Sequence, residues 1–288
     1  MLRDCNCEVM FFNRHQALNR LMLVVLNEEV RRRKSAGEAV TWLGTKDGAK
    51  AFCNTWRNDN ADFIQEHFGT EQENRRFVHG ILFATNRSRK TAPYCQSLLQ
   101  ADAAHLRFGK YTLFSVFAFT AQAQATSLGY GIIYGNEDTS SWSYFWSFIK
   151  GVHPGVNSPK ITIITDQDKG SSKAISKIVP EAHNFHCSYH RRQNILRDRS
   201  GGTQMYKTLW LFNLLIKKNT LEDLIETRTS VSPYMEESDK QYLLRMPDDQ
   251  QYPAARCAMA TNVMMYGRTS SQCVESMNAA NQRSEEHT

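Results

Sequence analysis

The chain has 288 residues, of which 41% are hydrophobic, 11% aromatic and 22% charged. This composition excludes intrinsic disorder of the whole chain and allows one large domain or two small ones with a sizeable core. The longest strongly apolar run, Leu21 to Leu26, is far shorter than the roughly 20 residues of a membrane-spanning helix. We therefore expect no membrane partner. The net charge of +6 permits a nucleic-acid partner, and the seven scattered cysteines indicate reduced thiols.

The first 84 residues are predicted to form a helical N-terminal region. Apolar residues recur at helical spacing from Leu18 to Val25, and a second helical stretch is expected from Thr45 to Phe68. Residues 84–90, with the sequence ATNRSRK, are interpreted as a basic connector. The pattern changes after this connector.

An α/β pattern follows. Three strand-like runs are joined by short connections, which favour antiparallel pairing, and two further strands each follow a helix and should be parallel. The expected elements are the strands Tyr94–Leu106, Tyr111–Phe119 and Thr126–Tyr134, the helix Ser140–Lys150, the strand Lys160–Thr165, the helix Ser171–Ile178 and a short strand around Phe185. This order, β-β-β-α-β-α-β, is the order of the ribonuclease H fold. We therefore expect an α/β protein with a ribonuclease H-like mixed sheet, followed by a helical insertion.

Two aspartates stand at the strands that such a topology places side by side. Asp102 lies near the end of the first strand-like run, and Asp166 directly follows the fourth. Two carboxylates held close together are costly unless a cation neutralises them, and oxygen ligands favour Mg²⁺ or Mn²⁺. Two such ions about 3.5–4 Å apart can clamp the attacking and leaving oxygens of a phosphodiester. The alternative is that each aspartate forms a turn or caps a helix, which is the stronger alternative for Asp166.

The same residues belong to a set of segments that resembles the catalytic domain of Mutator-like element (MULE) transposases. The segments agree with that family in order and spacing over roughly residues 85 to 282. They are DAAHL at 102–106, GNEDTSSWSYFWSFI at 135–149, ITIITDQDKGSSKAI at 161–175, VPEA at 179–182, FHCSYHRRQN at 185–194 and TSSQCVESMN at 269–278.

The resemblance implies a DDE transposase with a ribonuclease H-like core, which cleaves and transfers DNA strands with the help of metal ions. By position, Asp102 and Asp166 match the first two acids of the family and Glu275 matches the third. Residues 204–266 fit the helical insertion that the family carries between the second and third acids. Glu137 is a rival third acid, for which we favour a structural role such as capping.

A Cys-x-x-His pair and several cations accompany the acids. The family carries a Cys/His element at Cys187 and His190, so a zinc site there is weighed against a packed cysteine and a hydrogen-bonded histidine. Lys169, Arg191 and Arg192 are candidates for phosphate contacts, with a solvated surface as the alternative.

These inferences divide the chain into five parts. They are a helical N-terminal region (1–84), the first part of the catalytic core (85–203), the helical insertion (204–266), a truncated helix carrying the third acid (267–282) and a tail that we expect to derive from a sequencing adapter (283–288).

The predicted function is that of a MULE-type DNA transposase with an Asp/Asp/Glu triad and two Mg²⁺ or Mn²⁺ ions. Its partners would be double-stranded transposon and target DNA, it would act as a homo-oligomer, and it would reside in the nucleus. One alternative is a domesticated transposase that regulates transcription by binding DNA without catalysis. Another is a ribonuclease H-like nuclease unrelated to transposition, which would not need the long insertion.

Overall fold

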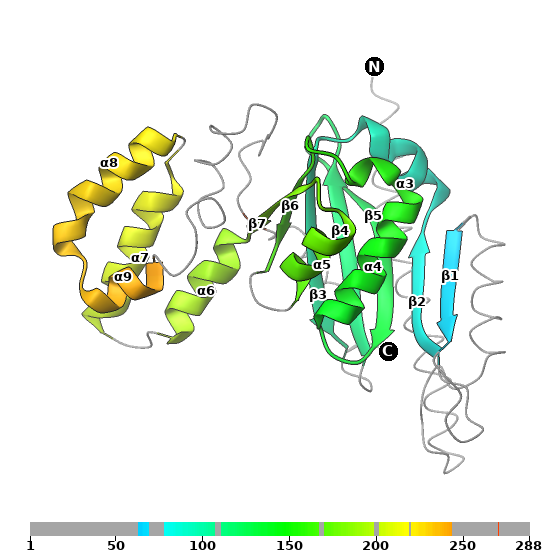
Figure 1. Cartoon of the computed structure of the whole chain (residues 1–288), viewed down its shortest axis with the longest axis horizontal. Helices are drawn as coiled ribbons and strands as arrows, with labels where there is room; N and C mark the ends of the chain where they lie inside the picture. Colours follow the sequence, from blue (N-terminus) through cyan, green and yellow to red (C-terminus); the bar gives the residue numbers. More distant parts are fainter. Residues whose placement is uncertain are drawn as a thin grey trace, which may run out of the picture.

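The computed structural model describes residues 63–68, 78–106, 111–166, 170–198, 202–218, 220–243 and 270, and every structural statement below refers to these residues. They form a mixed sheet with helices packed on it, and a separate group of helices beside it (Figure 1). None of the helices in these ranges is long and apolar enough to cross a membrane.

The sheet has seven strands in the order β1-β2-β5-β4-β3-β6-β7. Strands β3, β4 and β5 form an antiparallel meander, whereas β6 pairs in parallel with β3, and β7 with β6. The mixed α/β class is therefore confirmed, and so is the predicted succession β-β-β-α-β-α-β over residues 98–186. The strands are β1 (Phe63–Phe68), β2 (Val78–Ala84), β3 (Leu98–His105), β4 (Tyr111–Phe119), β5 (Ala125–Tyr134), β6 (Thr162–Thr165) and β7 (His183–His186).

The prediction of a helical region up to residue 84 is wrong for residues 63–68 and 78–84. Both segments are strands, and β2 extends the sheet by pairing with β5 in the register Gly80↔Ile133 to Phe83↔Tyr130. β2 also pairs with β1, and its other partner, β5, lies about 50 residues away, so the local sequence does not reveal that this segment joins the sheet. The rest of the helical prediction, including the stretch from residue 45 to 62, lies outside the described residues.

Helices α4 (Thr139–Val152) and α5 (Ser171–Ile178) cover one face of the sheet. The predicted aromatic face of α4 is confirmed, because Trp142, Phe145 and Trp146 are all buried there. Two glycines of β5, Gly129 and Gly131, allow this close packing. A Cβ on Gly131 would lie 2.6 Å from Leu82 Cδ2 and 3.0 Å from Phe145 Cδ2.

Two helices were not predicted. The connector at 84–90 contains α3 (Asn86–Thr91), whose N-cap Thr85 accepts a hydrogen bond from the Ser88 amide at 3.0 Å through its side-chain hydroxyl. The second is α6 (Ser188–Asp198), which directly follows β7. It buries Arg191 and Ile195, one turn apart.

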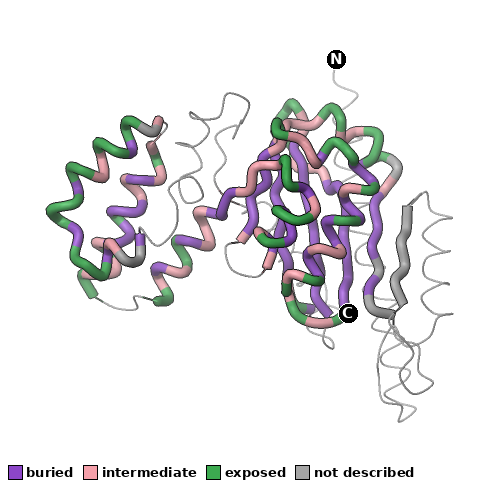
Figure 2. Tube along the Cα trace, in the orientation of Figure 1, coloured by how far each residue is buried: buried purple, intermediate pink, exposed green. Residues whose placement is uncertain are grey.

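The predicted helical insertion is present as α7 (Thr203–Ile216), α8 (Leu221–Val231) and α9 (Glu237–Leu243); its remainder lies outside the described residues. These helices share a core of their own, which includes Phe212, Leu224 and Leu243 and also takes in Ile195 of α6. Figure 2 shows this group with buried inner faces and a largely exposed α8, whereas β4, at the centre of the sheet, is buried along its whole length. The insertion is therefore a second packing unit, connected to the sheet through α6.

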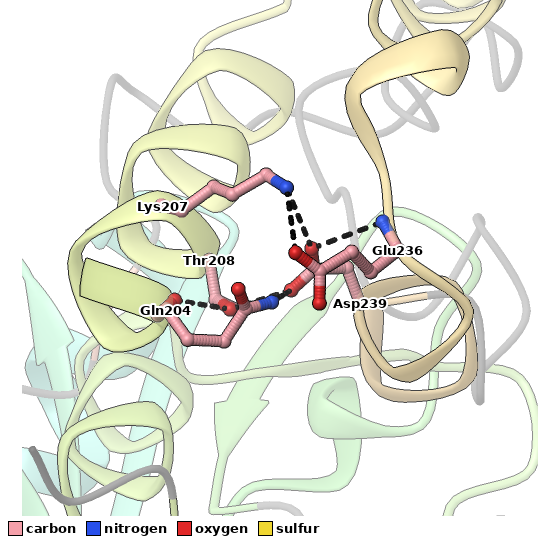
Figure 3. A network of polar contacts seen from close by, with 5 residues as sticks. All are labelled: Gln204, Lys207, Thr208, Glu236 and Asp239. Atoms are coloured by element: carbon pink, nitrogen blue, oxygen red, sulfur yellow. Dashed lines mark hydrogen bonds and ion pairs between the residues drawn. The ribbon is translucent and has the colours of Figure 1, made fainter. Parts of the chain in front are cut away.

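A buried carboxylate ties α7 to α9 within this unit (Figure 3). Asp239 is 0% exposed, and its Oδ1 accepts hydrogen bonds from Thr208 Oγ1 at 2.7 Å and Gln204 Nε2 at 2.9 Å. Its Oδ2 accepts one from the Glu236 amide at 3.3 Å, and Lys207 Nζ lies 4.0 Å away. A buried carboxylate is tolerated when donors surround it in this way, so the network fixes how the two helices pack.

Candidate active site

The two predicted aspartates lie on neighbouring strands. Asp102 is within β3 and is 8% exposed, and Asp166 directly follows β6. Strands β3 and β6 lie side by side in Figure 1 and pair in parallel from Leu98↔Thr162 to Gln100↔Ile164. The predicted adjacency of the two strands is therefore confirmed, and the same register continued by two residues would bring Asp102 level with Asp166.

Both aspartates belong to the face of the sheet opposite α4. Alternate residues of a strand point to opposite faces, and Leu99 and Ala101 of β3 pack in the core beneath α4. Leu98 instead packs with Ile164 and Phe185 in a second cluster on the other face. Asp102 is four residues after Leu98, and Asp166 is two residues after Ile164, so both share the face of that second cluster.

Asp166 does not cap the helix that follows it. Helix α5 begins at Ser171, and its N-cap is Gly170, which makes no side-chain capping bond. Gly170 has φ +83°, and a Cβ there would collide with the backbone of Thr139 at the start of α4. Position 170 therefore suits only glycine, which packs directly against the start of α4, and the capping interpretation of Asp166 loses its support.

The two residues of the Cys-x-x-His pair, Cys187 and His190, lie in different surroundings. Cys187 is buried in the second cluster, and its amide donates to the Thr165 carbonyl at 2.8 Å. His190, in the first turn of α6, places its Nδ1 3.9 Å from Asp166 Oδ1. In the described ranges no three His, Cys, Asp or Glu side chains are grouped closely enough to hold a metal ion. Zinc at this pair stays a prediction, and the observed partner of His190 is an acid of the candidate site.

The third predicted acid, Glu275, lies outside the described residues. Ser270, five residues earlier, is described, and its carbonyl accepts a hydrogen bond from Gln100 Nε2 at 2.5 Å. Gln100 is two residues before Asp102 and therefore shares its face of the sheet. Sequence reasoning missed Gln100, although a glutamine within an apolar strand, in phase with an aspartate, was a signal.

The rival acid Glu137 does not cap α4. That role belongs to its neighbour Asp138, whose Oδ1 accepts the Ser141 amide at 2.8 Å, so the expected capping role was assigned to the wrong residue. Capping requires a side-chain oxygen one residue before the first helical residue, and Asp138 occupies that position.

The predicted cationic contacts differ in their exposure. Arg192 is exposed, as an external phosphate contact requires. Arg191 is only 4% exposed, which contradicts its predicted role as a surface cation, because it lies on the inward side of α6 with Ile195. Lys169 lies outside the described residues.

Comparison with known proteins agrees with the family suggested by the sequence. A search of curated proteins found no match. The MULE transposase domain family matches residues 98–194. This range runs from the first residue of β3 into α6 and contains Asp102, Asp166 and His190. Residues 98–194 of this chain are therefore similar to the MULE transposase domain.

Proposed function

We propose that the protein is a DNA transposase that cleaves and transfers DNA strands through Asp102, Asp166 and Glu275. The observation that carries the proposal is the parallel pairing of β3, which contains Asp102, with β6, which Asp166 directly follows, within a range that matches the MULE transposase domain. The order β5-β4-β3-β6-β7 supports a ribonuclease H-like core, to which β1 and β2 are added at one edge.

The residues present suit a hard divalent cation such as Mg²⁺ or Mn²⁺. Asp102 and Asp166 provide carboxylate oxygens, and Asp102 is largely buried, so two negative charges at this place call for a compensating positive charge. Asp102, Asp166 and Glu275 would hold the ions. When bound, two such ions activate the attacking hydroxyl and stabilise the leaving oxygen of a phosphodiester.

The chain's own residues contribute alignment. The pairing of β3 with β6 supports a fixed spacing between Asp102 and the end of β6, and Gly170 packs against the backbone of Thr139. The His190 ring lies beside the Asp166 carboxylate and limits the orientations open to it. Rigid placement of this kind lowers the entropic part of the barrier to reaction.

The proposed partner is double-stranded DNA, including transposon ends and target DNA. The net charge of +6 and the exposed Arg192 support contacts with phosphates. We further propose that the active form is a homo-oligomer, because strand transfer joins two DNA ends to a target. We also propose that it acts in the nucleus.

A nicking assay on supercoiled plasmid with Mg²⁺ or Mn²⁺ tests the proposal. Asp102→Asn and Asp166→Asn should abolish nicking and leave DNA binding largely intact. Asp138→Asn is the matched control, because Asp138 is exposed and asparagine also caps helices well. Retained cleavage in both active-site variants would refute the assignment, and DNA binding without nicking in the unaltered chain would favour a domesticated regulator.

A further inference from the structure

Gln100 is a buried polar residue beside the proposed acids. It is 1% exposed and pairs with Ile164 of β6 on one side and Phe117 of β4 on the other. Its neighbours on this face are mostly apolar, and Phe117 is itself buried. An apolar residue would be the ordinary choice at such a position, because burying an amide is costly unless it is hydrogen-bonded.

The donor group of this amide is satisfied by a segment far away in the sequence. Gln100 Nε2 donates to the carbonyl of Ser270, 170 residues later, at 2.5 Å. The Oε1 atom of the same amide is buried and has no hydrogen-bond partner among the residues described. The contact with Ser270 is therefore what makes a glutamine tolerable at this point of the sheet, and it holds the chain at Ser270 against this face.

Chain geometry connects this contact to the third acid. An extended chain covers at most about 3.6 Å per residue, so Glu275 lies within about 18 Å of Ser270. Gln100 is about 7 Å from Asp102 along the strand. Holding Ser270 on Gln100 therefore limits how far the chain that leads to Glu275 can carry this acid from Asp102.

We propose that Gln100 is a positioning residue, which docks the chain at Ser270 so that Glu275 can join the two aspartates. The inference rests on the proposed function and adds to it a residue that does not itself contact DNA or metal ions. It predicts that the donor group of Gln100, rather than its size, sustains activity.

Gln100→Met tests this in the full chain, because methionine keeps the length of the side chain and removes the donor. The matched control is Gln96→Met, since Gln96 Oε1 has no hydrogen-bond partner in the described part of the chain and Gln96 precedes β3 at the end away from Asp102. The first readout is backbone hydrogen exchange around Ser270, which does not depend on activity. We expect about tenfold faster exchange there in Gln100→Met alone; unchanged exchange would overturn the docking role.

The second readout is metal-dependent nicking. Misplacing a catalytic group by about 1 Å can cost about a hundredfold in rate, so kcat should fall by about ten- to a hundredfold while KM for DNA stays within about twofold. Faster exchange with an unchanged kcat would overturn the positioning role. If the unaltered chain does not nick DNA, the proposed function and the catalytic role of the contact both fail, and the exchange result still decides whether Gln100 docks Ser270.

Discussion

Thr208→Val removes one donor from the buried carboxylate of the helical insertion and changes little else in shape. Thr208 and Asp239 are both 0% exposed, and the hydroxyl of Thr208 donates to Asp239 Oδ1 at 2.7 Å. A hydrogen bond to a charged group contributes about 1.5–3 kcal/mol when its loss leaves a buried acceptor unsatisfied. We therefore expect the free energy of unfolding to fall by about 2 kcal/mol.

Urea denaturation followed by circular dichroism measures this loss. With a slope of about 1–3 kcal/mol per molar urea, the midpoint should move by about 1 M. Thr229→Val is the matched control, because its hydroxyl donates to a carbonyl four residues earlier, that of Ile225, at 2.9 Å, but the residue is exposed. Exposed substitutions of this kind change stability by less than about 0.5 kcal/mol.

A double-mutant cycle identifies the source of the effect. If the lost energy belongs to the Thr208–Asp239 bond, Thr208→Val should cost much less in an Asp239→Ala background, with a coupling energy of about 1 kcal/mol or more. Equal losses for Thr208→Val and Thr229→Val, or a coupling energy near zero, would refute the reasoning.

Three further substitutions test the sheet and its loops. Gly131→Ala should destabilise the protein by about 1–3 kcal/mol in urea titrations, because its Cβ would press on α4 and β2, whereas Gly151→Ala, with open space around it, should not. Burial lowers the pKa of His153 below 6.5. At pH values below 6.5 the unfolded chain therefore binds a proton at His153 more readily than the folded chain, and the free energy of unfolding should fall as the pH drops. This fall should be smaller in His153→Gln. Gly170→Ala should reduce the nicking of plasmid DNA, because its Cβ would collide with Thr139 and displace position 170. Nicking at the wild-type rate would show that this close contact is dispensable.

The candidate site could be predicted from the sequence only in part. Asp102 lies in one apolar strand and Asp166 directly follows another. Both strands are visible in the local sequence pattern, so the sequence predicted where the two aspartates lie and that their strands are neighbours. The burial of Arg191 and the partners of His190 and Gln100 depend on α6 and on a segment 170 residues from β3. A local sequence pattern therefore could not reveal these contacts.

Elements whose signals are local could be located from the amino-acid sequence alone. The run Tyr111–Phe119 coincides with β4, and Ser171–Ile178 with α5, because apolar, β-branched and helical patterns there need no distant partner. The tertiary structure alone decided that residues 78–84 join the sheet and that the insertion packs around its own core through Asp239. The physical reason is that strand pairing and burial depend on partners that are remote in the chain, and those partners override local preference.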